Sequence, residues 1–381
     1  MIWRSHTGLA VRAMMRMDLS VIAFLMFTLL VVALTIDLAK WLPSVQARAD
    51  TTQTPFAKTL LTYVAYRSID IVTRLLTMAC VAGGFVAALL RHQRLEDVVL
   101  SAVGAGPSLR LVAILLSGLL LGTIQWAGEA WLRPIAVAAQ VQENLGDYGQ
   151  RYHNTDTGTQ WLVQEHIALH GTLIRGPDMH LTNVRLFGGV DTPELTHLLH
   201  AESLHPGPRP GLWTFTNATL WHLNSNRPTE QLATLTTPLP FDAMRLRWFG
   251  IDAYYMPTAV ARHIATLPHA PNASDAATAV AVRRAAPVLP GIFLLLGISL
   301  ASLATGPRRL SPFRLLALAA VAYLCVVSVK TFWALGIHAV LPPAAAATLP
   351  AFFALAVATL IQLHHAGKLR DILPILHKRH P

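Results

Sequence analysis

Long apolar runs dominate the hydrophobic pattern of this chain. Six of them reach the roughly 20 residues that an α-helix needs to cross about 30 Å of hydrocarbon. They cover residues 19–41, 66–90, 111–131, 285–306, 315–338 and 344–363. Runs of this length with few charges are typical of transmembrane helices. The pattern therefore predicts six transmembrane helices, three on each side of a long intervening segment.

The intervening segment has a different pattern. Short runs of strand-forming residues are separated by Gly, Pro and Asn breaks, and they predict strands over residues 160–163, 168–174, 180–187, 212–223 and 244–249. Short strands at this spacing are typical of a β-sandwich or a jelly roll. We therefore expect three membrane helices within 1–138, an inserted all-β jelly-roll domain over 139–282, and three further helices with a tail over 283–381.

Composition supports a membrane class and excludes others. Apolar residues make up 53% of the chain and charged residues 13%, whereas soluble domains carry about a quarter charged residues. Disordered chains are rich in charge and poor in apolar residues, so disorder is excluded. Cys80 and Cys325 both lie inside apolar runs, which excludes a disulfide scaffold. The net charge of +10 does not indicate nucleic acid binding, because the basic residues cluster beside the apolar runs.

The basic residues also predict an orientation. The two tails and the loops after the second and fourth spans hold 13 of the 30 Lys and Arg residues, whereas the loop after the first span holds only Arg48 and Lys58. Because short cytoplasmic loops are enriched in Lys and Arg, both termini are expected in the cytoplasm. The β domain is then on the outer side of the membrane, which is the periplasm in a Gram-negative cell.

The cytoplasmic segment after the second span predicts a short amphipathic helix at about 94–105. Leu95, Val98, Val99 and Ala102 have helical spacing, and glycines follow them. Periodicity leaves two interpretations open. The helix lies at the lipid surface, or it docks into a partner and transmits the partner's motion.

This segment resembles the coupling helix of the LptF/LptG permeases, and three other segments resemble the same family. Ile36–Lys40 (IDLAK) ends the first span, Leu212–Asn217 (LWTFTN) matches a strand, and Thr305–Arg309 (TGPRR) matches a Gly-Pro-basic loop. Asp37 and the coupling segment are more similar to LptG than to LptF. One departure is at the exit of the third span, where Gly128-Glu129 is followed by Pro134 with one residue more than the family pattern.

The resemblance implies a permease half-subunit of an ABC transporter rather than an enzyme. Such a subunit pairs with a second LptF/LptG-type permease, and an LptB-type ATPase dimer drives lipopolysaccharide from the bacterial inner membrane to an LptC-type periplasmic protein and bridge. No cofactor is expected, because ATP is bound by the ATPase subunit. The sequence agrees independently, since its one Gly-Lys pair, Gly367-Lys368, is not part of a phosphate-binding loop. The resemblance places the ATPase contacts on Leu95, Glu96, Asp97 and Val99.

Basic residues near the outer ends of the spans are candidate ligands for the lipid phosphates. The set comprises Lys40, Lys330, Arg74, Arg133 and Arg284, with Arg67 and Arg283 at the same level. Intramembrane charges are costly and usually functional, and Arg and Lys bind phosphate by charge-assisted hydrogen bonds. The alternatives are snorkelling and pairing with Asp37, Asp70 or Glu129.

Two further interpretations concern metals and function. The paired histidines, such as His166 and His170, come without the additional ligands of a zinc site, so no metal is expected. A function of another class also fits the layout. The chain would then be a membrane-anchored signalling or assembly protein whose outer β domain binds a ligand or partner.

Overall fold

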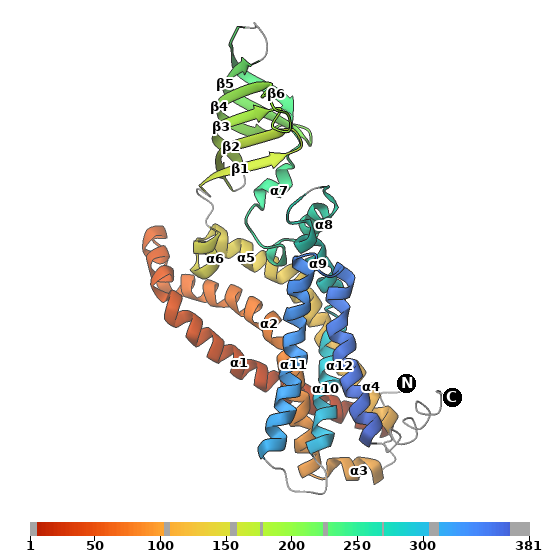
Figure 1. Ribbon diagram of the computed structural model, residues 1–381. Helices are drawn as coiled ribbons and strands as arrows, with labels where there is room; N and C mark the ends of the chain where they lie inside the picture. Colours follow the sequence, from red (N-terminus) through yellow and green to blue (C-terminus); the bar gives the residue numbers. More distant parts are fainter. Residues whose placement is uncertain are drawn as a thin grey trace, which may run out of the picture. The chain divides into compact units, whose positions relative to one another are not determined.

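The computed structural model describes residues 6–102, 107–152, 158–175, 178–223, 228–268, 270–304 and 312–365. The chain divides into two compact units. The helical unit comprises Met1–Leu42, Leu60–Ala136 and Ser274–Pro381, and the sheet unit comprises Pro43–Thr59 and Val137–Ala273 (Figure 1). The hairpin between the first two long helices thus belongs to the sheet unit.

Long helices make up the helical unit, and some of them extend into residues of the sheet unit. Their bounds are α1 His6–Thr52, α2 Phe56–Gln93, α4 Pro107–Ala127, α5 Arg133–Gln142, α9 Ala273–Ala285, α10 Leu289–Ala304, α11 Pro312–Ile337 and α12 Pro343–His365, with a short α3 at Glu96–Ala102 and a π-helix, η2, at Gly128–Leu132. Within the part of the chain that the structure describes, five helices are long and apolar enough to cross a membrane. A sixth span would combine α9 and α10, which are bent by 62°.

The bend between α9 and α10 has a local cause. Pro287 lies in the break, and Pro290 follows in the first turn of α10. Proline lacks the N–H that would continue a helix and clashes with the preceding turn. As a result α10 begins at Leu289, four residues after the start of the predicted run at residue 285.

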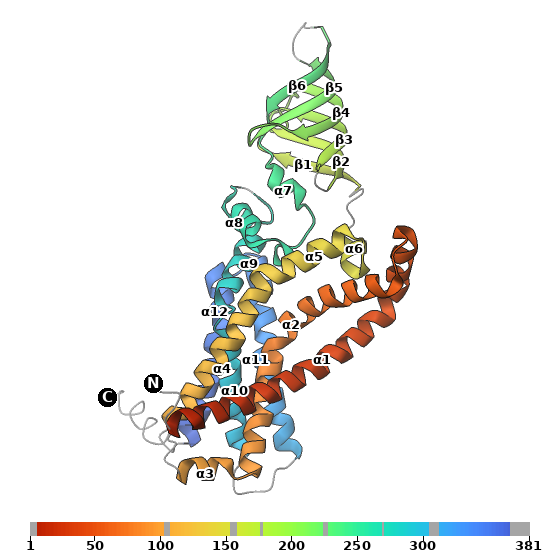
Figure 2. The same cartoon turned by 180° about the vertical axis from the view of Figure 1, so that it is seen from behind.

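Close helix packing centres on α10, which contacts α4 and α12 (Figures 1 and 2). Gly118 of α4 lies against the backbone of Gly291, and Gly122 lies against the carbonyl group of Pro287. A Cβ at either glycine would overlap these backbone atoms. Small residues four apart let two membrane helices approach in this way.

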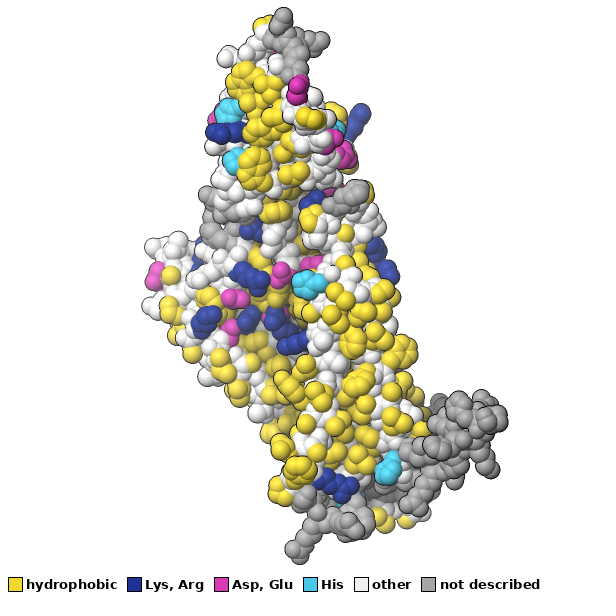
Figure 3. All heavy atoms as spheres, viewed as in Figure 1, with side chains coloured by type: hydrophobic (Ala, Val, Ile, Leu, Met, Phe, Trp, Pro, Cys, Tyr) yellow, Lys and Arg dark blue, Asp and Glu magenta, His cyan; other side chains and the backbone are white. Residues whose placement is uncertain are grey.

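The outward surfaces of the helices are apolar. Figure 3 shows an almost uniformly apolar surface over α11 and α12, where Phe313, Leu316, Leu324 and Phe352 are each more than 60% exposed. Water-soluble monomers rarely expose apolar patches of this extent. These faces are suited to contact lipid.

The sheet unit contains one six-stranded antiparallel sheet. Its strands are β1 Thr159–Gln164, β2 Ile167–Ile174, β3 His180–Gly188, β4 His197–Pro206, β5 Leu212–His222 and β6 Glu230–Pro238. They pair in sequential order, β1-β2-β3-β4-β5-β6. The described strands therefore form a meander and do not confirm the jelly roll, in which strands return by Greek-key connections between two sheets.

Alternation along the strands buries one face of this sheet. Leu169, Leu181 and Phe215 are fully buried on three different strands. Trp213 is also buried, and its Nε1 donates to the carbonyl of Phe241 at 3.0 Å. This bond gives the buried indole N–H of Trp213 a hydrogen-bond partner. It also holds the segment that follows β6 against the buried face of the sheet.

One predicted strand is wrong. Residues 244–249 were expected to be extended, but Ala243–Arg247 form helix α7. The side chain of Asp242 accepts a hydrogen bond from the backbone N–H of Arg245 at 2.7 Å, so it caps the first turn. The cap and the tertiary packing of Leu246 outweigh the alternation of apolar residues in this short segment.

Short helices complete the sheet unit. They are α6 Gly146–Arg151, the 3-10 helix η3 Ala253–Tyr255 and α8 Thr258–Thr266. Tyr148, Tyr152 and Tyr255 pack their rings together at centroid distances of 5.1–6.3 Å. This cluster connects α6 to the segment that follows the sheet.

Candidate functional site

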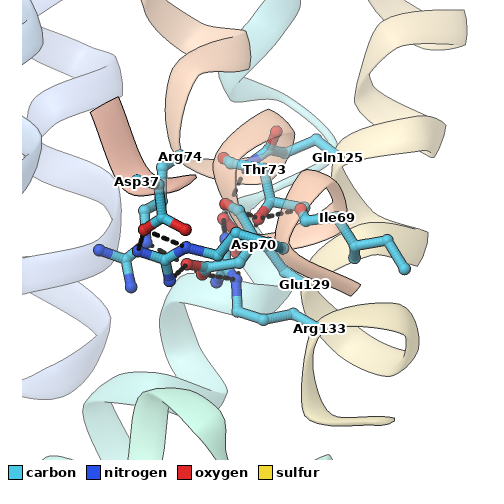
Figure 4. A network of polar contacts seen from close by, with 9 residues as sticks. Asp37, Ile69, Asp70, Thr73, Arg74, Gln125, Glu129 and Arg133 are labelled. Atoms are coloured by element: carbon cyan, nitrogen blue, oxygen red, sulfur yellow. Dashed lines mark hydrogen bonds and ion pairs between the residues drawn. The ribbon is translucent and has the colours of Figure 1, made fainter. Parts of the chain in front are cut away.

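Asp70 of α2 is the centre of a network of charged residues within the helical unit (Figure 4). Its carboxylate is 1% exposed and receives Arg67 at 3.1 Å and Arg74 at 2.9 Å from its own helix. Arg133 reaches the same carboxylate from α5, with Nε 3.5 Å from Oδ1. One buried carboxylate thus holds three guanidinium groups.

Arg67 extends the network to α1. Its guanidinium contacts the carboxylate of Asp37 at 2.7 Å, and the hydroxyl of Tyr63 donates to the other oxygen of that carboxylate at 2.5 Å. Both Asp37 and Asp70 are therefore neutralised by partners within the bundle. The predicted pairing of Asp70 with Arg74 at i,i+4 is confirmed.

Thr73 and Gln125 connect the network to α4. The Thr73 hydroxyl accepts from Nε of Arg133 at 3.0 Å, while its backbone carbonyl accepts from Nε2 of Gln125 at 2.8 Å. Gln125 also donates to Glu129 at 2.6 Å, and Glu129 lies 3.8 Å from Nη2 of Arg133. Neither Thr73 nor Gln125 was predicted as a site residue. Both are polar residues within apolar runs, and this position was a signal in the sequence that could have identified them.

The π-helix η2 positions Glu129 and Arg133. The backbone N–H of Arg133 donates to the carbonyl of Gly128, five residues earlier, so one extra residue is fitted into the helix. This turn falls where the sequence has one residue more than the family pattern. Gly128 lacks a Cβ and lies directly against the side chain of Thr73, which brings Arg133 within reach of α2.

Burial differs sharply among the basic residues of the network. Arg133 is 0% exposed and Arg283 is 3% exposed, whereas the side chain of Arg74 is 42% exposed. Arg283 of α9 adds a favourable Coulombic interaction with Glu129. Buried charges are tolerated only when they are paired and hydrogen-bonded, and Asp37 and Asp70 meet that condition.

The formal charges of the network do not cancel. Three acids, Asp37, Asp70 and Glu129, face four arginines at positions 67, 74, 133 and 283. The sum is therefore +1, and Arg74 carries its charge to the surface. An anion at that surface would be attracted by the guanidinium of Arg74.

Three other predicted ligands form no part of the Asp70 network. Lys40 follows Asp37 by three residues on α1, and its ammonium group lies 4.6 Å from the ring centroid of Trp41. Lys330 on α11 and Arg284 on α9 are both exposed. Neither forms an ion pair with an acidic residue in the described ranges. The structure thus brings Arg74 and Arg133 together on Asp70 and leaves the other three cations exposed.

The segment predicted to contact an ATPase forms α3, preceded by a tight reversal at Arg94 and Leu95. Leu95 has a φ of 58°, and its carbonyl accepts from the N–H of Val98 at 3.0 Å. Leu95, Val98 and Val99 are each about 60% exposed, so the predicted apolar face is present. Glu96 lies 3.8 Å from Arg94; residues 103–106 and the Asp97 side chain lie outside what the structure describes.

Long apolar helices, a buried ion network and a separate antiparallel sheet define a polytopic membrane protein with an extramembrane domain. Residues 13–363 match the family described as lipopolysaccharide export system permease LptF/LptG, and the chain belongs to this family. The family comprises both LptF and LptG. A search of the curated proteins found no match. The chain is therefore a lipopolysaccharide export permease of the inner membrane.

Proposed function

We propose that this chain is one permease half of an ABC transporter that extracts lipopolysaccharide from the inner membrane. It would pair with a second LptF/LptG-type permease and pass the lipid to an LptC-type periplasmic protein. The family match over residues 13–363 carries the proposal, since it spans both the helices and the sheet.

The proposed membrane topology has six spans, with α9 and α10 together forming the bent fourth. Both termini lie in the cytoplasm and the sheet unit in the periplasm. The distribution of basic residues supports this orientation, because the end of α2, the turn that follows it and the start of α4 hold Arg91, Arg94 and Arg110.

Lys40, Lys330, Arg74 and Arg284 are the proposed ligands of the lipid phosphates. Each is exposed, and Arg and Lys suit phosphate through charge-assisted hydrogen bonds. Arg133 has no exposed surface, so we assign it a positioning role. It would hold Asp70, which in turn orients the exposed guanidinium of Arg74.

The proposed energy source is a separate LptB-type ATPase dimer that binds ATP. The exposed apolar face of α3 supports a docked helix, because Leu95 and Val99 are each about 60% exposed. Glu96 and Asp97 would add anionic contacts. Closure of the ATPases would move α3 and, through α2 and α4, the helices that hold the lipid.

Reconstitution tests the substrate assignment. The complex of this chain with its permease and ATPase partners is placed in proteoliposomes with lipopolysaccharide, and ATP-dependent transfer to a soluble bridge acceptor is measured. Lys330→Gln and Lys40→Gln should each lower transfer about ten-fold, because each loses a charge-assisted contact. Lys58→Gln, at an exposed position in the first turn of α2, is the matched control. Transfer by both variants at the wild-type rate would contradict the assignment.

A further inference from the structure

A second polar site lies within the helical unit, away from the network of Asp70. A cavity of about 670 Å³ is lined by residues of α1, α2, α4, α10 and α12. This volume is within the range of small-molecule sites. Nothing in the proposed transport mechanism uses it.

Basic side chains contribute to the lining of the cavity. Asp18 of α1, 1% exposed, pairs with Arg91 of α2 at 2.5 Å. Arg110 of α4 and His92 of α2 also line the cavity. The lining thus contains two guanidinium groups and one carboxylate. Guanidinium groups bind phosphodiesters by charge-assisted hydrogen bonds.

Much of the remaining lining is apolar. Leu111 and Ile114 of α4 and Leu295 and Ile298 of α10 contribute to this apolar wall. A site with a cationic end and an apolar wall matches an amphipathic ligand rather than a small hydrophilic anion.

The position of the cavity also favours a lipid. Arg91 and His92 lie in the last turn of α2, Arg110 in the first turn of α4, and Gln362 in the last turn of α12. Helix ends in a membrane protein lie near the headgroup level. The apolar wall therefore begins where acyl chains would begin.

We propose that this cavity binds the phosphate headgroup of a glycerophospholipid. Under the proposed topology the lipid belongs to the cytoplasmic leaflet, opposite the leaflet from which lipopolysaccharide is taken. Arg110 and Arg91 hold the phosphate, and one acyl chain lies along Leu111, Ile114 and Ile298. The site is distinct from the Asp70 network and does not depend on the transport assignment.

Native mass spectrometry of the full-length chain in detergent tests the proposal. The probes are phosphatidylglycerol, diacylglycerol without a phosphate, and inorganic phosphate as a competitor. Wild-type protein should retain phosphatidylglycerol and not diacylglycerol. Arg110→Gln should weaken retention about ten-fold, which is the effect of one lost charge-assisted hydrogen bond. Arg110 is only part-buried, so this variant avoids breaking the buried Asp18–Arg91 pair.

Two further variants complete the test: one is a control, and the other distinguishes a lipid phosphate from a free phosphate ion. Arg16→Gln is the matched control, because Arg16 is exposed on α1 and does not line the cavity; it should bind as wild type. Ile298→Trp fills the apolar wall and should lower lipid retention. Equal retention by Arg110→Gln and wild type would overturn the proposal. Retention of diacylglycerol would also overturn the proposal. Competition by inorganic phosphate, together with no effect of Ile298→Trp on lipid retention, would overturn it too, because this result would indicate a site for free anions.

Discussion

Asp70 on α2 and Arg133 on α5 face each other with almost no exposed surface, at 1% and 0%, and 3.5 Å separates Oδ1 from Nε. Thr73 binds the same Nε at 3.0 Å. The pair therefore joins two helices through one carboxylate and one hydroxyl. Because Arg74 shares that carboxylate, the buried pair also fixes the orientation of a cation at the surface.

Removing the carboxylate should destabilise the helical unit. Asp70→Asn removes one of the two carboxylates that pair with the buried Arg133 and leaves only Glu129 at 3.8 Å. Breaking a buried pair costs about 3–5 kcal/mol. We expect a clearly lower thermal unfolding midpoint in detergent micelles. Asp50→Asn is the control, because Asp50 is exposed on α1 and such surface changes stay within about 0.5 kcal/mol. Equal midpoints for the two variants would refute the role given to Asp70.

The close approach of α4 and α10 predicts a second effect on stability. Gly118→Ala places a methyl group against the backbone of Gly291, and such overpacking costs about 1–3 kcal/mol. Leu119→Ala, at a residue that is 65% exposed on the same helix, should change the unfolding midpoint less. The comparison is made in one detergent at one pH. A larger loss for Leu119→Ala would show that the helices do not pack through Gly118.

The apolar face of α3 predicts a specific loss of the ATPase partner. Val99→Asp puts a charge on the exposed face and should reduce co-purification of the ATPase at least about ten-fold, as expected for a buried contact at an interface. Ser108→Lys, at an exposed position near the start of α4, is the control. Undiminished recovery of the ATPase with Val99→Asp would exclude this face as the docking surface.

Two histidines of β4 predict acid sensitivity of the sheet unit. Burial lowers the pKa of His197, with His222 and His166 adding to the effect. Burial likewise lowers the pKa of His205, with a further contribution from His180, whereas Asp178 raises it. The folded state then binds fewer protons than the unfolded state, whose histidines titrate near pH 6.5. Stability is therefore present above about pH 6.5 and is lost as the pH falls toward the lowered pKa.

Tryptophan fluorescence of the full chain measures this effect, because Trp213 is buried in the sheet. The unfolding midpoint of that signal should be lower at pH 5 than at pH 7.5. A His197→Asn, His205→Gln variant should lose part of this dependence. A midpoint that rises on acidification would mean that the sign of the proton linkage is wrong.

Elements whose hydrophobic pattern extends over many residues, and contacts set by helical spacing, were predictable from the sequence. The apolar runs located α1, α2, α4, α11 and α12, because a membrane helix carries its signal over about 20 residues. The Asp70–Arg74 pair followed from i,i+4 spacing alone. Strands β1, β2, β3 and β5 were also located, since each alternates apolar and polar residues.

The remaining features depend on contacts that spacing does not encode. Strand β6 is partly exposed on both faces, so it has no alternation to detect, and β4 is interrupted by histidines. The burial of Arg133 depends on the π-turn at Gly128 and on Thr73 of another helix. The Asp18–Arg91 pair joins residues 73 positions apart. Tertiary packing decides each of these, and a single sequence gives no distance between helices.

The central claim is that this chain exports lipopolysaccharide, and depletion of the chain in its own cells tests it most directly. Inner and outer membranes are separated after depletion, and lipopolysaccharide is quantified in each. The account predicts accumulation in the inner membrane, reversed by wild-type protein and not by the Val99→Asp variant. Normal delivery of lipopolysaccharide to the cell surface in depleted cells would contradict it.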